Sequence, residues 1–488
     1  MYYTTANTLN DDVLLCIFYY YRLCDQNSWD AQLGWFKLSH VCRRWRHLLH
    51  SLAFLLGLHI QCTNGSPIVD TLDHMPPVPL SVDYSCEIAT ISKQDELGIY
   101  HALRLRDRVR RIVLHIPPPT LQSCLTLMDE AFLTLERLSL SSIVDEISSL
   151  IVPKTFLAPN LRHLTLNGVG LPKRLQLLTS TISLVTLALT NIRVSGYFRP
   201  RLLVARLQLL PQLEELSIGF SIPLPRPSTE GELLGKQGAP VTLPNLKLLT
   251  FQGVSSYLEC FAAQIRTPLL EHLDITLFCQ IAFALSHLSY FIERTEGLEL
   301  FNAEVLFWRD VVCVALGRHS GGWYDRRFVL RVKCRQLDWQ IDCAGQICRA
   351  LMPVLSGMKT LTLDFHEEMM PTEWQGGEID GTTWHELLRS FIGVKELRIC
   401  NSLSEELSRV LEIASELGLL PGLEKLISEF TKDPTTLFRL FIDARQVAGH
   451  PVDLSFSFLR PLLRLPPSSL PIFSHQHLQY HHQDHQPL

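Results

Sequence analysis

The chain has no marked excess of either charge, no long apolar run and no closely paired cysteines. Its 44 basic and 49 acidic side chains leave a formal charge of -5 over 488 residues. This balance argues against a general phosphate-binding surface, and so against nucleic acid as the main partner. The arginine run from Arg104 to Arg111 is the counter-argument, but apolar residues interleave with it. That pattern predicts an edge strand or a helix with a solvated face.

The longest apolar stretches, residues 52–60 and 281–292, are shorter than the ~20 residues needed to span a bilayer, so we expect no membrane partner. The first residues have neither the basic start nor the apolar core of a signal peptide. The 13 cysteines are scattered among leucine and isoleucine without a C-x-x-C pair, which indicates reduced thiols. We therefore expect a cytoplasmic or nuclear protein.

Catalytic motifs are also missing. His385 and Glu386 begin a zinc-protease pattern, but Arg389 stands where the second histidine ligand would be. Residues 231–237 have too few positions between their glycines for a phosphate loop. The acidic and histidine residues at 364–368 follow a predicted strand, which favours a charged loop over an acid/base pair. We therefore predict a protein that is not an enzyme and has no catalytic, cofactor-binding or metal-binding residues.

What the sequence does contain is a pair of predicted amphipathic helices near its start, within residues 9–49. Apolar residues recur on each helix at i, i+3 and i+4 spacing, which places them on one face. The first stripe holds Leu14, Ile17 and Phe18, and the second holds Leu38, Val41, Cys42 and Trp45. About forty residues are too few to bury both stripes, so they must contact either another protein or the neighbouring part of the chain.

This segment resembles an F-box, whose usual form is a Leu-Pro-x-Asp/Glu helix followed by a Leu-x-x-Val-Cys-(Lys/Arg)-x-Trp helix. The match is carried by Leu9, Leu14, Ile17, Phe18, Leu38, Val41, Cys42, Arg43, Arg44 and Trp45. Asn10 stands where the family normally has proline. Asparagine can cap the helix, and Asp11 and Asp12 then lie at the positive end of its dipole. We therefore expect this helix to form despite the change.

The resemblance implies that the chain is a substrate receptor of a cullin-RING ubiquitin ligase. Such receptors bind a small Skp-type adaptor, and through it a cullin, while another domain binds the target protein. The implied adaptor-binding residues are Leu9, Val13, Leu14, Ile17, Phe18, Leu38, Val41, Cys42 and Trp45. The alternative function is a repeat-based interaction scaffold outside any ligase, and Asn10 is the feature that favours it.

A phrase of the form L-x-x-L-x-L returns from residue 135 onward. Its central leucines are Leu138, Leu164, Leu187, Leu216, Leu249 and Leu273, with weaker copies at Leu298-Leu300, Met358-Leu363, Val394-Ile399 and Leu423-Leu426. Most intervals fit the ~20 to 29 residues of leucine-rich repeats, and the Leu216 to Leu249 interval carries an insertion. Each phrase predicts a strand that buries its leucines by stacking on the next repeat.

The position that usually carries asparagine or cysteine in such repeats is mostly apolar here, as at Val169 and Ile192. We therefore expect an irregular solenoid, with an unrelated α/β domain of leucine-rich strands as the alternative. The predicted class is α/β, an N-terminal helical F-box followed by an irregular leucine-rich-repeat solenoid. The predicted domains are a helical module at 5–57, a proline-rich junction with the first strands at 58–115, the solenoid at 116–455 and a disordered tail at 456–488.

Further stretches of the chain resemble the large F-box families of mushroom-forming fungi. They are Cys62-Thr63 with Gly65 and Pro67, then Pro79 to Tyr84, Asp107 to Ile112 and Phe441 to Val452. This resemblance covers most of the chain but implies no particular target protein.

Overall fold

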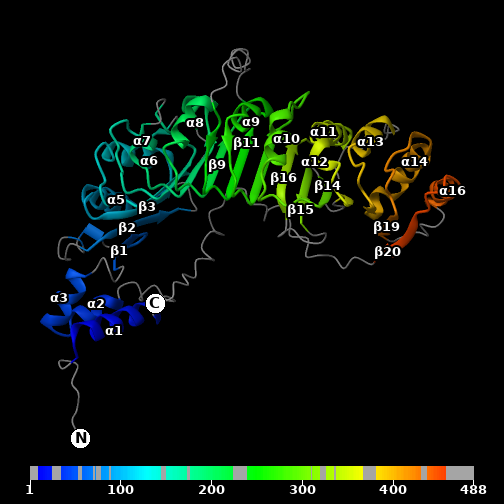
Figure 1. Ribbon diagram of the computed structural model, residues 1–488. Coiled ribbons are helices and arrows are strands. Elements are labelled where there is room, and N and C mark those ends of the chain that lie inside the picture. Colours follow the sequence, from blue (N-terminus) through cyan, green and yellow to red (C-terminus); the bar gives the residue numbers. More distant parts are fainter. Residues whose placement is uncertain are drawn as a thin grey trace, which may run out of the picture.

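The computed structural model describes residues 9–24, 34–52, 58–66, 68–69, 72, 78–86, 90–143, 150–172, 176–223, 239–308, 310–318, 326–334, 337–365, 381–429 and 437–457. Figure 1 shows an elongated solenoid with a long sheet along one side and helices along the other, and with a group of short helices beside its N-terminal end. The fold is an α/β leucine-rich-repeat-like solenoid.

One sheet of sixteen strands runs through the solenoid in the order β1-β2-β3-β4-β6-β8-β9-β11-β13-β16-β15-β14-β17-β18-β19-β20. These strands are β1 (Ile60–Thr63), β2 (Leu80–Ser85), β3 (Val109–Ile116), β4 (Arg137–Ser142), β6 (His163–Asn167), β8 (Thr186–Ile192), β9 (Glu215–Phe220), β11 (Leu248–Gly253), β13 (His272–Phe278), β14 (Asn302–Trp308), β15 (Val311–Gly317), β16 (Arg326–Lys333), β17 (Thr360–Phe365), β18 (Glu396–Ile399), β19 (Lys425–Glu429) and β20 (Asp453–Ser457). Two short sheets pair β5 (Leu150–Ile151) with β7 (Val169–Gly170), and β10 (Val241–Thr242) with β12 (Ile265–Arg266).

Helices connect successive strands on the other side of the solenoid (Figure 1). They are α5 (Lys93–Arg104), α6 (Pro118–Leu127), α7 (Leu177–Ser180), the 3-10 turn η3 (Val194–Gly196), α8 (Pro200–Leu207), α9 (Ser255–Ala262), α10 (Ser286–Glu293), α11 (Leu337–Ala350), α12 (Met352–Leu355), α13 (Gly381–Leu388), α14 (Asn401–Leu417) and α16 (Arg439–Val447). Proline begins several of them, as at Pro118 and Pro200, where the missing N–H costs no helical hydrogen bond.

The predicted repeats are confirmed by the register of the sheet. Leu138 lies opposite Leu164, Leu164 opposite Leu187, and Leu187 opposite Leu216. The same register continues through Leu249 to Leu273. The first four of these leucines are fully buried. Each strand therefore supplies equivalent side chains to one continuous core, as expected for stacked repeats.

The sheet is not parallel throughout, because β14, β15 and β16 form antiparallel pairs. On either side of this group the sheet is parallel again, because β16 pairs in parallel with β13 and β14 pairs in parallel with β17. The repeat expected at Leu298-Leu300 is displaced, since its strand begins at Asn302 and Ala303 lies opposite Leu361. Val305 to Trp308 and Val312 to Leu316 are apolar and buried on both faces of the sheet, so alternation could not reveal these strands, although the charged residues Arg309 and Asp310 separate the two runs in the sequence.

Adjacent coils are connected by side chains that the repeat consensus does not place there. Val169 and Ile192 are buried apolar residues, as predicted for an irregular array. Polar contacts between coils occur at other positions, including those before the strands, where Asn160 Nδ2 donates to Leu133 O at 2.7 Å and Asn245 Nδ2 donates to Pro211 O at 2.9 Å. Both asparagines follow a proline and precede the leucine phrase, so a signal for these contacts was present in the sequence.

Glu259 on α9 connects two coils through the N-terminus of α10. Its carboxylate accepts hydrogen bonds from the backbone N–H groups of His287 and Leu288, each at 2.8 Å, and from Ser286 Oγ at 3.2 Å. Leu285, at the N-cap position, makes no side-chain cap. Glu259 thus stabilises the orphan N–H groups and the positive dipole end of α10.

We expect Glu259→Ala to lower the free energy of unfolding by about 1–3 kcal/mol, because it leaves buried donors of α10 unpaired. Glu259→Gln should cost less, since an amide oxygen can still accept. The control is Glu405→Ala, whose pair with Arg409 is exposed and should contribute about 0.5 kcal/mol or less. Chemical denaturation followed by circular dichroism measures both. Equal losses in the Glu259 and Glu405 variants would contradict the capping role.

Only the end of the arginine-rich run, Arg110 and Arg111, lies in a strand, whereas Arg104 ends α5; that strand is interior, since β3 pairs with both β2 and β4. The edge-strand expectation was therefore wrong. The arginines remain compatible with an interior strand because acidic residues of neighbouring coils pair with them. Arg110 forms an ion pair with Glu136, and Arg111 with Asp83. These pairs belong to the protein's own structure and leave less positive charge for a nucleic acid.

Candidate protein-binding surfaces

The N-terminal helices are α1 (Asp11–Cys24), α2 (Gly34–Ser39) and α3 (Arg43–Ser51). The second predicted helix is thus broken into two, because Cys42 is extended and caps α3, with its Sγ accepting from Trp45 N. The cap predicted at Asn10 is confirmed, since its Oδ1 accepts from Val13 N at 2.9 Å. Arg44 on α3 contacts the start of α1, pairing with Asp11 at 2.6 Å and donating to Leu9 O at 2.7 Å.

Two residues of the predicted adaptor contact are inside the protein. Leu14 and Phe18 lie on one face of α1 and have almost no exposed surface. The ring of Phe18 meets Trp45 edge-on, with ring centroids 5.0 Å apart and planes at 67°. Leu48 and Leu49 of α3 are buried as well. These side chains hold the helices together, so their effect on a partner would be indirect.

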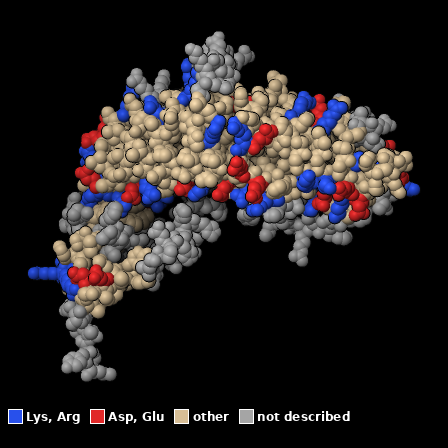
Figure 2. All heavy atoms as spheres, in the orientation of Figure 1, with Lys and Arg blue, Asp and Glu red and all other residues tan. Residues whose placement is uncertain are grey.

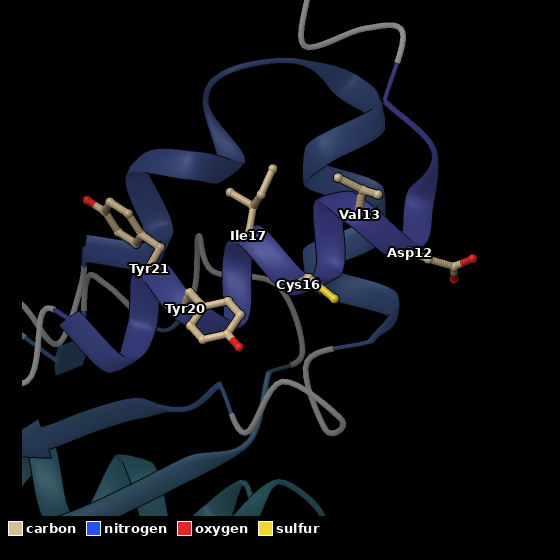
Figure 3. Close-up of a pocket in the computed structure, with 6 residues that line it drawn as sticks. All are labelled: Asp12, Val13, Cys16, Ile17, Tyr20 and Tyr21. Carbon is tan, nitrogen blue, oxygen red and sulfur yellow. The ribbon is translucent and has the colours of Figure 1, made fainter. Parts of the chain in front are cut away.

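A second apolar face of α1 points away from that core. Val13 is 43% exposed, Ile17 41% and Tyr20 65%. They recur at i, i+4 and i+7, so they follow one side of the helix. Figure 3 shows these side chains leaving successive turns of α1, with Asp12, Cys16 and Tyr21 lining the same open hollow. We call these six residues the α1 hollow.

The remaining predicted contact residues are divided. Val41, between α2 and α3, is 56% exposed, whereas Leu9, Leu38, Cys42 and Trp45 are partly buried. Sequence reasoning did not select Cys16, Tyr20 and Tyr21, although their spacing continues the stripe of Val13 and Ile17. The structure therefore separates one predicted set into an internal face and an exposed face.

The sheet also has a face that alternates with the buried leucines, which we call the open face. Ser139, Thr165, Ala188, Ser217 and Thr250 lie opposite one another on successive strands and are half-buried. They are short side chains, so a polypeptide can approach the strands closely along this row. Beside it, His163 Nδ1 lies 3.2 Å from Thr186 Oγ1, which donates to Glu215 Oε2 at 3.3 Å.

Charges of both signs occur close together on the solenoid. Figure 2 shows basic and acidic side chains interspersed along its lower edge. Several are paired between strands, including Arg331 on β16 with Asp274 on the neighbouring β13, and Arg326 on β16 with Glu304 on β14, across β15. Burial raises the pKa of Asp83, and Arg111, 3.4 Å away, opposes that shift. A partner of this face would therefore be selected by mixed polar contacts rather than by one sign of charge.

Candidates for chemistry are few among the residues that the structure describes. His385 and Glu386 lie in α13 and Asp364 in β17, whereas residues 366–368, 231–237 and 458–488 fall outside the description. One group in the described part of the chain brings metal-ligating atoms together, namely Cys279, Cys334 and Cys343. Sequence reasoning did not find this group, because the three cysteines are far apart along the chain.

Within the described ranges, no helix is both long and apolar enough to cross a membrane.

Neither protein-family models nor curated proteins give a match to this chain. Among solved structures, the chain is similar to the leucine-rich repeat-containing protein LegL7 from Legionella pneumophila, at 12% sequence identity and a TM-score of 0.27. That match covers 78% of this chain and 97% of the other.

Proposed function

We propose that this chain is the substrate-recognition subunit of an SCF-type cullin-RING ubiquitin ligase. In this proposal the N-terminal helices form an F-box that binds a Skp-type adaptor, and the repeats bind a target protein. Ubiquitin transfer would be catalysed by the partners. The chain would act by proximity, since holding a target near the charged conjugating enzyme raises its effective concentration.

The observation that carries the proposal is the α1 hollow. The inner face of α1 already supplies Leu14 and Phe18 to the core, so the exposed Val13, Ile17 and Tyr20 are not needed to hold the helices together. Contiguous exposed apolar side chains on a soluble surface are characteristic of a protein interface. The F-box sequence pattern names the partner class, because the exposed Val13, Ile17 and Val41 belong to the residues that it implies for adaptor binding.

The open face supports the second half of the proposal. Its short side chains, most of them hydroxyl-bearing, lie on a long, mostly parallel sheet, and extended surfaces of this kind serve protein binding in repeat proteins. Mixed charges and hydrogen-bonding groups would give specificity without a single dominant pocket. The exposed side chains of the strands form no charge pattern that identifies the target protein.

Direct binding tests the proposal. The purified full chain is titrated with a Skp-type adaptor in a calorimeter, and we expect a 1:1 complex with a Kd of about 1 µM or tighter. Capture from cells with the proteasome blocked would then recover adaptor, cullin and target together. Absence of any adaptor complex at concentrations well above that Kd would refute the ligase role.

The second candidate is an interaction scaffold outside a ligase, and Asn10 favours it. The F-box pattern has proline at this position. Asparagine lacks the proline ring, so an apolar contact with the adaptor would be missing at the start of α1. A chain that captures a protein through its repeats but binds no Skp-type adaptor would support the scaffold.

A further inference from the structure

Three thiols meet where the repeat pattern is interrupted. Cys279 directly follows β13 and Cys334 directly follows β16, and the register places Phe278 opposite Lys333 at the ends of these neighbouring parallel strands. Cys343 lies on α11, the helix that follows β16. The Sγ atoms of the three residues all lie within 4.8 Å of one another. The cluster therefore lies where β16, and not the next strand in the chain, β14, pairs with β13.

We propose that Cys279, Cys334 and Cys343 form a three-thiolate site for a thiophilic d10 metal ion such as Zn²⁺. With Zn–S bonds of ~2.3 Å, sulfur atoms in a tetrahedral site are about 3.8 Å apart, so the thiols need to approach by about 1 Å at most. A water molecule would complete the coordination. It has access because Cys279 is exposed, whereas Cys334 and Cys343 are buried.

The segments that carry the cysteines are fixed by hydrogen bonds. Buried Gln340 on α11 donates from Nε2 to the carbonyl oxygens of Cys334 at 2.8 Å and Trp308 at 2.7 Å. Gln346, also on α11, donates to Ile281 O at 3.3 Å, two residues beyond Cys279. The cluster is therefore held from outside on all three segments, which is the support that metal ligands require.

The protonation state of the cluster explains how an ion would act there. Burial raises the pKa of the Cys279 thiol, while a thiol hydrogen bond with Cys334 and then burial raise the pKa of Cys343. Both shifts favour the neutral thiol, so a bound cation must displace the thiol protons. Binding of Zn²⁺ would form three Zn–S bonds and release three protons, and the site would carry one net negative charge. Metal affinity should consequently rise with pH.

Metal binding at this site would stabilise the antiparallel segment that connects the two parallel parts of the sheet, the strands from β1 to β13 and those from β17 to β20. It would connect β13, β16 and α11 by bonds that do not depend on repeat stacking. This role is separate from adaptor binding by the N-terminal helices, so either proposal can fail alone.

The test uses the full reduced chain, freed of metal with a chelator and titrated with Co²⁺ and with Zn²⁺. We expect one ion per chain, thiolate-to-Co²⁺ charge-transfer absorption, and a higher melting temperature with Zn²⁺. Cys279→Ser, an exposed change, and Cys334→Ala should each weaken Zn²⁺ binding at least about 100-fold and abolish the absorption. Cys348→Ala is the matched control, because Cys348 is buried on the same helix outside the cluster.

Three outcomes would overturn the proposal. They are no Co²⁺ absorption in the native chain, equal metal binding by the Cys279→Ser variant, or a disulfide between two of the three residues in air-exposed protein that binds no metal. Mass spectrometry of the unreduced protein detects the last. The exposed position of Cys279 keeps the test decisive even if Cys334→Ala fails to fold.

Discussion

Replacing Trp384 by alanine should lower the free energy of unfolding by about 3–5 kcal/mol, the largest single-residue loss that we expect in the solenoid. Trp384 on α13 is fully buried, and its ring lies 5.7 Å from that of Phe307 on β14, at 67°. Its Nε1 also donates to Glu406 Oε1 on α14 at 2.6 Å. The change therefore opens a cavity and removes a donor from a carboxylate at the same time.

Trp339→Ala provides the matched control, since that side chain is 59% exposed and its loss should cost about 0.5 kcal/mol or less. Trp384→Phe separates the two contributions, because it retains much of the packing but loses the hydrogen bond. Denaturant unfolding followed by circular dichroism avoids a signal that depends on tryptophan itself. Similar losses for Trp339→Ala and Trp384→Ala would show that the contacts of Trp384 are not the cause.

The second large effect concerns the α1 hollow. Ile17→Asp should weaken binding of a Skp-type adaptor at least about 100-fold, or roughly 2.7 kcal/mol, because it places an unpaired carboxylate in an apolar interface. Ile17 is exposed, so helix content and melting temperature should stay close to those of the wild type. Calorimetric titration measures the affinity, and circular dichroism measures the fold.

Two further variants make this result specific. Leu440→Asp introduces the same change at a residue that is 61% exposed on α16, at the opposite end of the solenoid, and should leave adaptor binding intact. Leu14→Asp buries a charge inside the helical group, so it should lose binding together with helix content. If Ile17→Asp binds the adaptor as tightly as the wild type does, the α1 hollow is not the docking surface.

The regular part of the fold could be predicted because its signal is local. The phrase around Leu138 and Leu164 gives both the strand and its register, since a shift of one residue would expose every buried leucine. The cap at Asn10 was predictable for the same reason, as the residue and its hydrogen-bond partner lie within one helical turn. The interior position of β3 was missed, because ion pairs with residues of adjacent coils do not appear in the local pattern.

The docking residues show the limit of such reasoning. Periodicity identified Leu14, Ile17 and Phe18 as one apolar set, but it could not tell which of them face α3 and which face solvent. Only the packing of Phe18 on Trp45 makes that division. The exposed set then gains Tyr20 and Tyr21, which the family pattern does not include.

The amino-acid sequence by itself determined the α/β class, the stacking of leucine-rich repeats and the presence of N-terminal helices, because these depend on contacts that repeat at short intervals. The tertiary structure alone decided the inversion at β14 to β16, the exposed side of α1 and the meeting of Cys279, Cys334 and Cys343. Each of these results from contacts between segments distant in sequence, whose pairing is selected by the packing of the whole array and not by any local pattern.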